Sequence, residues 1–179
     1  MPPAGFARMA EWQVAANCSL VRLPDKIVAL SSITRDPQLD IIAKRWGKPS
    51  SGGDPTATVY QRSWDCCGNM MNALYTSLQW STSGGGVYPV NQWNTTIYLN
   101  DGWYLDYQNL QYTYGTVGGP EVDLNGNAGY GWSWGGFYNS YQNWLYAFGD
   151  GHYTCNYFYS WQNSAPGWTE QAWCAYGSP

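Results

Sequence analysis

Residues 149–161 read Gly-Asp-Gly-His-Tyr-Thr-Cys-Asn-Tyr-Phe-Tyr-Ser-Trp and contain the clearest alternation in the chain. From residue 152 onward, every second side chain belongs to an apolar set, which consists of Tyr153, Cys155, Tyr157, Tyr159 and Trp161. The side chains between them are mostly polar. A period of two with one apolar face is typical of an antiparallel strand that is buried on one side. The glycines before it mark a turn, so this stretch predicts a β-rich C-terminal region.

Further strand and turn signals lie upstream of this stretch. Residues 95–99 and 103–107 are rich in β-forming side chains, and Asp101-Gly102 between them predicts a tight hairpin. On the second strand of that hairpin, every other residue from 103 to 107 is expected on one face. Asn125-Gly126 marks another turn.

One segment of the C-terminal part predicts a helix instead, over about residues 66–80. Met71, Leu74, Tyr75 and Leu78 recur three or four residues apart, which is the spacing of one apolar helix face. The triple glycine at residues 84–86 ends this unit.

The first part of the chain predicts mixed structure. Residues 4–16 have the apolar spacing of a short helix, and residues 26–33 resemble a strand. Asp36-Pro37 has the residue types of a helix N-terminus, and Gly47 ends that second helix after Trp46.

A loop rich in Ser, Gly and Pro at residues 48–55 separates two compositions. We therefore expect an α+β chain with two parts. Residues 1–55 form an N-terminal region, and residues 56–179 form an aromatic-rich β domain that lacks Lys and Arg beyond Arg62.

The distribution of charge limits the partners of this chain. All eight Lys and Arg residues lie at or before Arg62, whereas residues 63–179 carry seven acids and no basic side chain. Such a surface repels phosphate backbones, so we expect no nucleic acid at the C-terminal region. No apolar run is long enough to predict a membrane span, and no secretory signal is visible.

The five cysteines predict one disulfide and no metal site. Cys155 and Cys174 are the two cysteines of the C-terminal region, so they are the expected pair. A bridge between the adjacent Cys66 and Cys67 would strain the backbone. The cysteine spacings match no zinc signature, and the sequence predicts no cofactor.

The abundant Tyr and Trp residues are candidates for a binding surface. Each has a rigid apolar face and a polar tip, which suits both the core of a small β domain and contacts with sugar rings or partner proteins. The densest run is residues 131–144. The candidate binding residues are Trp103, Tyr104, Trp132, Trp134, Tyr138 and Trp144.

We therefore expect a non-enzymatic surface or extracellular protein that acts through aromatic and neutral polar surfaces. Its expected partners are copies of itself, in a coat, layer or filament, or glycans.

A catalytic alternative rests on two short segments. Cys67 precedes the predicted helix, Gln61 lies six residues before it, and Gly151-His152 begins a predicted strand. This arrangement resembles the papain-like cysteine peptidases, particularly their bacteriocin-leader-processing branch. The resemblance implies a cysteine hydrolase in which Cys67 is the nucleophile, His152 the base and Gln61 the oxyanion donor.

The resemblance covers residues 61–74 and 151–157 and departs from the family at its third member. The family places Asp or Asn about sixteen residues after the His, but residue 168 is Trp, and Asn163 is the nearest candidate. A second resemblance, of Trp64-Asp65-Cys66-Cys67 to a motif in one endoglucanase family, implies that Asp65 and Asp123 are a carboxylate pair.

Overall fold

The computed structural model describes residues 6–15, 20–29, 54–98 and 102–176, and these residues form ten β-strands. The strands are β1 (Phe6–Val14), β2 (Leu20–Ala29), β3 (Thr56–Trp64), β4 (Met70–Ser83), β5 (Gly86–Tyr98), β6 (Trp103–Gly115), β7 (Glu121–Trp132), β8 (Tyr138–Phe148), β9 (Tyr153–Gln162) and β10 (Thr169–Tyr176). No helix occurs in the described ranges, so none there is available to cross a membrane. The expected α+β class is therefore wrong, because the described chain is all-β.

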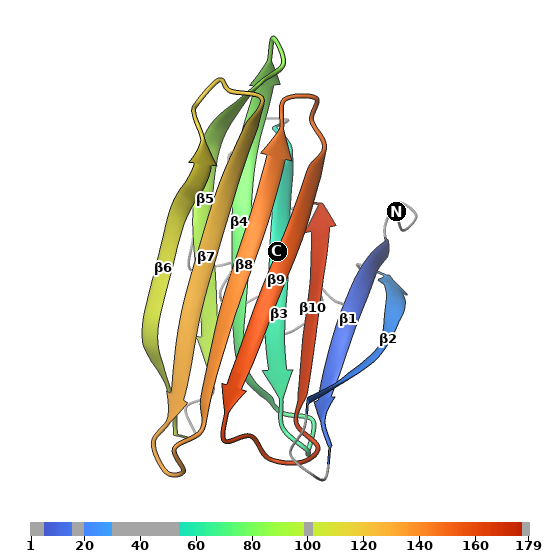
Figure 1. Cartoon of the computed structure of the whole chain (residues 1–179), viewed down its shortest axis with the longest axis vertical. Helices are drawn as coiled ribbons and strands as arrows, with labels where there is room; N and C mark the ends of the chain where they lie inside the picture. The colour runs from blue at the N-terminus through green and yellow to red at the C-terminus, as the bar shows by residue number, and fades with distance from the viewer. Residues whose placement is uncertain (1–5, 16–19, 30–53, 99–101, 177–179) are drawn as a thin grey trace.

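The strands form two antiparallel sheets that pack face to face (Figure 1). A six-stranded sheet has the order β2-β1-β10-β3-β4-β5, and a four-stranded sheet has the order β6-β7-β8-β9. The chain passes from the first sheet to the second between β5 and β6 and returns with β10. Because β10 lies between β1 and β3, the last strand joins the N-terminal hairpin to the centre of the larger sheet.

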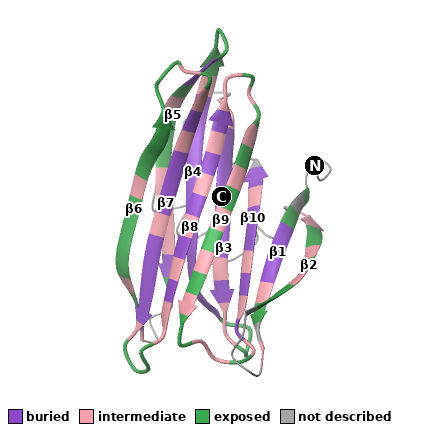
Figure 2. Ribbon diagram, in the orientation of Figure 1, coloured by how far each residue is buried: buried purple, intermediate pink, exposed green. Residues whose placement is uncertain are grey.

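Two apolar clusters fill the space between the sheets, and a third lies on the far face of the six-stranded sheet. One cluster between the sheets centres on Leu78 and Trp80. The other centres on Leu74, Tyr130 and Tyr141. The third contains Tyr60, Tyr75 and Trp173, whose side chains are also buried. β4 contributes to all three clusters, and Figure 2 shows it buried along most of its length.

The predicted helix at residues 66–80 is wrong. A turn occupies the residues around Cys66 and Cys67, and β4 follows from Met70. The sequence misleads here because β4 is buried on both faces from Met70 to Trp80. A strand with two buried faces has no polar side to alternate with its apolar side, so its apolar residues can match a helical spacing by chance.

The three predictions for the N-terminal region have different outcomes. The helix expected at residues 4–16 is wrong, because β1 covers Phe6–Val14. The strand expected at residues 26–33 overlaps the end of β2, and its last residues lie outside the described ranges. The helix expected from Asp36 to Trp46 also lies outside them.

Two turn predictions are wrong, and the opening prediction is confirmed. β5 and β6 are both strands, but they belong to different sheets and do not pair as a hairpin. Asn125-Gly126 lies inside β7 rather than at a turn. β9 is a strand from Tyr153 to Gln162 whose residues alternate between half-buried and exposed, as the sequence predicts.

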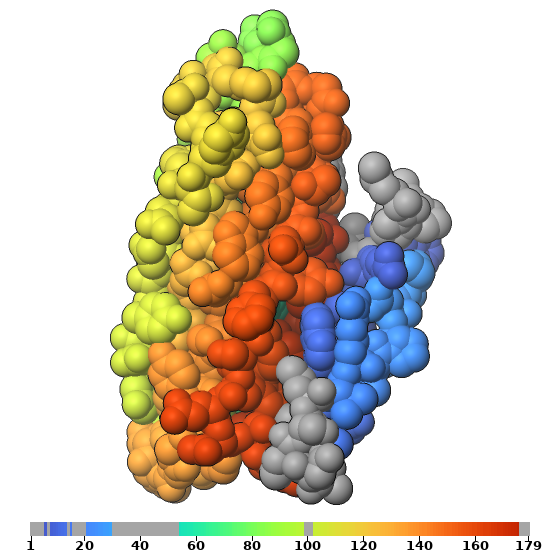
Figure 3. Space-filling model, viewed as in Figure 1, coloured from blue at the N-terminus to red at the C-terminus, as the bar shows by residue number. Residues whose placement is uncertain are grey.

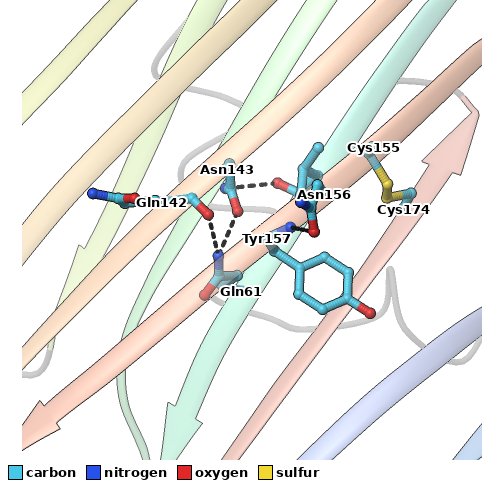
Figure 4. The surroundings of a disulfide bond; sticks show 8 residues. Gln61, Gln142, Asn143, Cys155, Asn156, Tyr157 and Cys174 are labelled. Carbon is cyan, nitrogen blue, oxygen red and sulfur yellow. Dashed lines mark hydrogen bonds between the residues drawn. A yellow bond between two sulfur atoms is a disulfide. The ribbon is translucent and has the colours of Figure 1, made fainter.

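Cys155 of β9 and Cys174 of β10 lie at disulfide distance, with their Cα atoms 6.5 Å apart (Figure 4). This is the expected pairing. Since β9 and β10 belong to different sheets, the bridge joins the two layers of the sandwich.

Candidate binding surface

The outer face of the four-stranded sheet, which points away from the six-stranded sheet, carries three of the six candidate binding residues, Tyr104, Tyr138 and Trp144. It faces the viewer in Figure 3, from the yellow of β6 and β7 to the orange of β8 and β9. Cross-strand register places Tyr104 opposite Gly131, and Gly131 opposite Tyr138, on neighbouring strands of this face. Residues from β6, β7 and β8 therefore meet here although they are far apart in the sequence.

Two glycines of β7 make room for flat aromatic rings. The Tyr104 ring lies directly over Gly131, where a Cβ atom would collide with it. The Tyr107 ring and the Tyr138 hydroxyl lie over Gly129 in the same way. We call this group the tyrosine platform, and it consists of Tyr104, Asp106, Tyr107, Gly129, Gly131 and Tyr138.

A β-bulge brings both β6 tyrosines to the platform. The register of β6 against β7 shifts between Leu105 and Tyr107, so Tyr104 and Tyr107 lie on one face although they are three residues apart. An undisturbed strand would place them on opposite faces. The expectation that residues 103, 105 and 107 share a face is therefore wrong.

The platform carries one carboxylate and keeps its rings open to solvent. The Tyr138 hydroxyl donates to Asp106 Oδ2 over 3.0 Å, and Asp106 is exposed. Burial, together with this carboxylate, raises the pKa of the Tyr138 hydroxyl well above its usual range. Tyr104 and Tyr107 are 46% and 42% exposed. The Tyr138 hydroxyl therefore stays neutral at physiological pH, and the rings of Tyr104 and Tyr107 remain open to solvent beside a strong hydrogen-bond acceptor.

The same outer face continues along β8 and β9 with alternating aromatic and amide side chains. Trp144 of β8 lies between Asn125 of β7 and Asn156 of β9. Phe158 is among the exposed residues of β9 and lies opposite Gln142. The basic residues of the chain all lie at or before Arg62, so this face has none. Its chemistry is therefore aromatic, neutral polar and acidic.

The other tryptophan candidates belong to one end of the sandwich or to its core. Trp103 is buried and packs against Trp168 between the sheets. Trp132 is half-buried, with its ring centroid 5.3 Å from that of Phe137. Trp134, in the β7–β8 loop, is 80% exposed. Core packing therefore accounts for Trp103, whereas Trp134 is available to a partner.

Sequence reasoning missed Asp106, Tyr107 and Phe158. The signal for Phe158 was present, because the alternation of β9 places it on the polar, outward side. Glycines two residues apart at 129 and 131 are the sequence signal for close approach of other groups to this strand. The bulge that aligns Tyr107 has no such signal.

The structure does not bring Cys67 and His152 together. Cys67 lies in the turn after β3, and His152 lies in the turn after β8, at the other end of the sandwich (Figure 1). Near the end of β3, Ser63 contacts the Tyr141 hydroxyl. From Tyr141, β8 continues for seven residues to Phe148, which is about 24 Å of strand. A thiol and a base this far apart cannot exchange a proton directly.

The remaining catalytic candidates have structural contacts. Gln61 is buried and its Nε2 donates to Asn143 Oδ1 and to the Gln142 carbonyl, both at 2.8 Å (Figure 4). Asn163 follows β9 with a positive φ of 56°, and its Nδ2 donates to the Gly136 carbonyl. Neither side chain contacts Cys67 or His152.

His152 makes its contacts within its own turn, and the two carboxylates of the proposed pair lie at opposite ends of the sandwich. His152 Nδ1 contacts Asp150 Oδ1 within its own turn, and the ring stacks on Phe148. Asp65 lies in the turn after β3, whereas Asp123 lies near the start of β7, at the end of the sandwich that holds His152. Burial raises the pKa of Asp123 to about 6, and nearby Glu121 adds to this effect.

Metal ligands do not gather in the described part of the chain: no three His, Cys, Asp or Glu side chains there are placed to hold an ion.

Comparisons with known proteins found no relative. No protein-family model matches the chain, and no curated protein or solved structure is significantly similar to it.

Proposed function

We propose that this protein binds neutral glycans on the outer face of the four-stranded sheet, without catalysing a reaction. The observation that carries the proposal is the tyrosine platform, where the rings of Tyr104 and Tyr107 lie over two glycines and remain exposed. Exposed aromatic rings on an open sheet face mark an interaction site more often than ordinary surface does.

The chemistry of the platform suits a sugar ring. The apolar C–H face of a sugar packs on a flat aromatic ring, and tyrosine loses little conformational entropy when it is immobilised by a ligand. The Asp106 carboxylate beside the rings accepts hydrogen bonds from sugar hydroxyls. Because this face has acids and no basic side chain, it favours neutral glycans over sulfated or sialylated ones.

The disulfide between Cys155 and Cys174 supports an extracellular or surface location, since such bridges persist in oxidising compartments.

A glycan array followed by titration of the best ligand tests this proposal. We expect neutral oligosaccharides to bind, and we expect Tyr104→Ala and Tyr107→Ala each to weaken binding about tenfold, or about 1.4 kcal/mol. Tyr114→Ala is the matched control, because Tyr114 is an exposed tyrosine at the other end of β6. The glycan affinity of Tyr114→Ala should equal that of the unmodified protein.

The proposal fails if no glycan binds, or if Tyr114→Ala weakens binding as much as the platform variants do. Circular dichroism of each variant separates loss of the site from loss of the fold.

Self-association is a second candidate function, and β9 is the observation that favours it. β9 is an edge strand of ten residues without a proline, a charged residue or a bulge. The other three edge strands each carry an interruption: Pro24 in β2, Pro89 in β5 and two bulges in β6. Such features block pairing between sheet edges, so β9 is the edge most open to a second copy.

A further inference from the structure

Cys66 and Cys67 lie side by side in the exposed turn between β3 and β4. Their sulfur atoms are 3.7 Å apart, and both side chains are exposed free thiols. The turn around them is well defined by Asp65, whose Oδ1 accepts the backbone N–H groups of Cys67 and Asn69 at 2.8 Å. Two accessible thiols are thus held close together on an ordered turn.

We propose that Cys66 and Cys67 form a thiol–disulfide exchange site, which small disulfides such as oxidised glutathione convert into a vicinal disulfide. In the first step one cysteine thiolate attacks the small disulfide, forms a mixed disulfide and releases one thiol. The neighbouring thiolate then attacks the cysteine sulfur of that mixed disulfide and releases the second thiol. The two cysteines are oxidised, one small disulfide is reduced to two thiols, and no further reagent is required.

The two thiols influence each other's ionisation. The Cys66 sulfur raises the pKa of the Cys67 thiol, and the Asp65 carboxylate adds a smaller effect in the same direction. Either cysteine can make the first attack as a thiolate, and its neighbour then resolves the mixed disulfide. Cys66 also lies against Gly167 of the β9–β10 loop, which has no side chain to cover it.

Adjacency makes the resulting bridge easy to reduce. The Cα atoms of neighbouring residues are about 3.8 Å apart across a trans peptide, which is shorter than the span of an ordinary disulfide. A strained, exposed disulfide is reduced more readily than a structural one. The bridge between Cys155 and Cys174 spans two sheets and 19 residues, so it serves as the structural reference within the same chain.

Equilibration of the full chain in glutathione buffers of graded composition tests the proposal. Free thiols are alkylated in each buffer, and the chymotryptic peptide spanning residues 65–70 is weighed. We expect an unalkylated form that is about 2 Da lighter than the reduced peptide, because forming the ring removes two hydrogens. We expect the equilibrium constant for oxidation of this pair to be at least about 100-fold smaller than that of the Cys155–Cys174 pair.

Single variants test whether both cysteines are required. Cys66→Ser and Cys67→Ser cannot close the ring, so each should accumulate a mixed disulfide with glutathione. Both should retain the β-sheet circular dichroism of the unmodified chain, since the cysteine side chains are exposed.

Three results would overturn the proposal. The first is that the pair remains reduced in every buffer that oxidises glutathione-reactive control peptides. The second is that either cysteine is bridged to Cys18 or to a second chain instead of to its neighbour. The third is that the single variants show no glutathione adduct.

Discussion

At the level of single residues, the interior of the sandwich is unusually polar. Glu170 is fully buried, and Ser63 Oγ donates to its Oε2 at 2.8 Å. Its other carboxylate oxygen has no hydrogen-bond partner. Burial raises the pKa of this carboxyl well above its ordinary value of 4.5. The native protein therefore holds a proton on Glu170 that the unfolded chain releases.

This proton makes stability depend on pH. Above about pH 4.5 the unfolded chain loses the proton while the native state keeps it, so the free energy of unfolding falls as pH rises, by up to about 1.4 kcal/mol per pH unit. The fall ends when the pH passes the raised native pKa. We expect Glu170→Gln to flatten this dependence and to stabilise the protein at pH 7. Urea unfolding from pH 4 to pH 8 measures both effects.

The exposed Asp106 provides a control for that experiment. An Asp106→Asn variant should retain the pH dependence of the unmodified protein between pH 4.5 and the native pKa of Glu170. Identical pH profiles for Glu170→Gln and the unmodified protein would contradict the assignment of the proton to Glu170.

The polar interior also explains which residues the sequence could not place. Asn143 is fully buried, and its amide Nδ2 donates to the Val59 and Leu74 carbonyls of the facing sheet. Amide side chains are usually exposed, so nothing in the composition distinguishes Asn143 from a surface asparagine. By contrast, Tyr104 and Tyr138 could be proposed as binding residues, because aromatic density near glycines is visible in the sequence.

At the level of strands, the predictability of each element follows from its burial. β9 is half-buried on one face and exposed on the other, so its sequence alternates between apolar and polar residues and predicts a strand. β4 is buried on both faces, so its sequence lacks this alternation and predicts a helix instead. The pairing of β5 with β4 rather than with β6 depends on contacts between distant segments, which a local Asp-Gly signal does not report.

The disulfide between β9 and β10 gives a prediction at this level. It closes a short segment of the unfolded chain, since its cysteines are 19 residues apart. A loop of that size is expected to contribute about 3 kcal/mol through the entropy of the unfolded state. We expect the double variant Cys155→Ala/Cys174→Ala to lose about this amount in urea unfolding.

The comparison variant is Cys66→Ala/Cys67→Ala, which removes two exposed thiols and should leave the free energy of unfolding within about 0.5 kcal/mol. If the two double variants unfold at the same urea concentration, the bridge does not stabilise the sandwich.

At the level of the whole molecule, the two sheets differ in charge. The described basic residues all lie on the six-stranded sheet. Three of them form ion pairs on the N-terminal hairpin: Arg8 and Arg22 with Asp25, and Lys26 with Glu11. Arg62 stacks between Trp64 and Trp173 on the far side of that sheet. The four-stranded sheet is left without a cation, which is the physical basis for expecting an uncharged or cationic partner there.

The uncharged edge at β9 predicts how the whole molecule behaves in concentrated solution. If copies pair through β9, light scattering should show a mass that rises from monomer to dimer with concentration. Thr154→Lys places a charge on this edge and should shift the equilibrium toward monomer at least about tenfold, because a lysine must then be desolvated or repelled.

A lysine elsewhere provides the control for this prediction. Thr113→Lys introduces the same charge on exposed β6 and should leave the association unchanged. A protein that remains monomeric at every concentration would exclude association through β9, while leaving glycan binding to be decided by the array.

The position of β10 between β1 and β3 has a consequence for protein synthesis. Gln171 of β10 donates to Glu11 of β1 across 160 residues of chain. On the ribosome, the hairpin of β1 and β2 emerges before the other strands and then lacks its β10 partner until residues 169–176 are translated. The six-stranded sheet is completed only once β10 leaves the exit tunnel. Emergence of β10, rather than of any early strand, therefore sets the moment at which this sandwich closes.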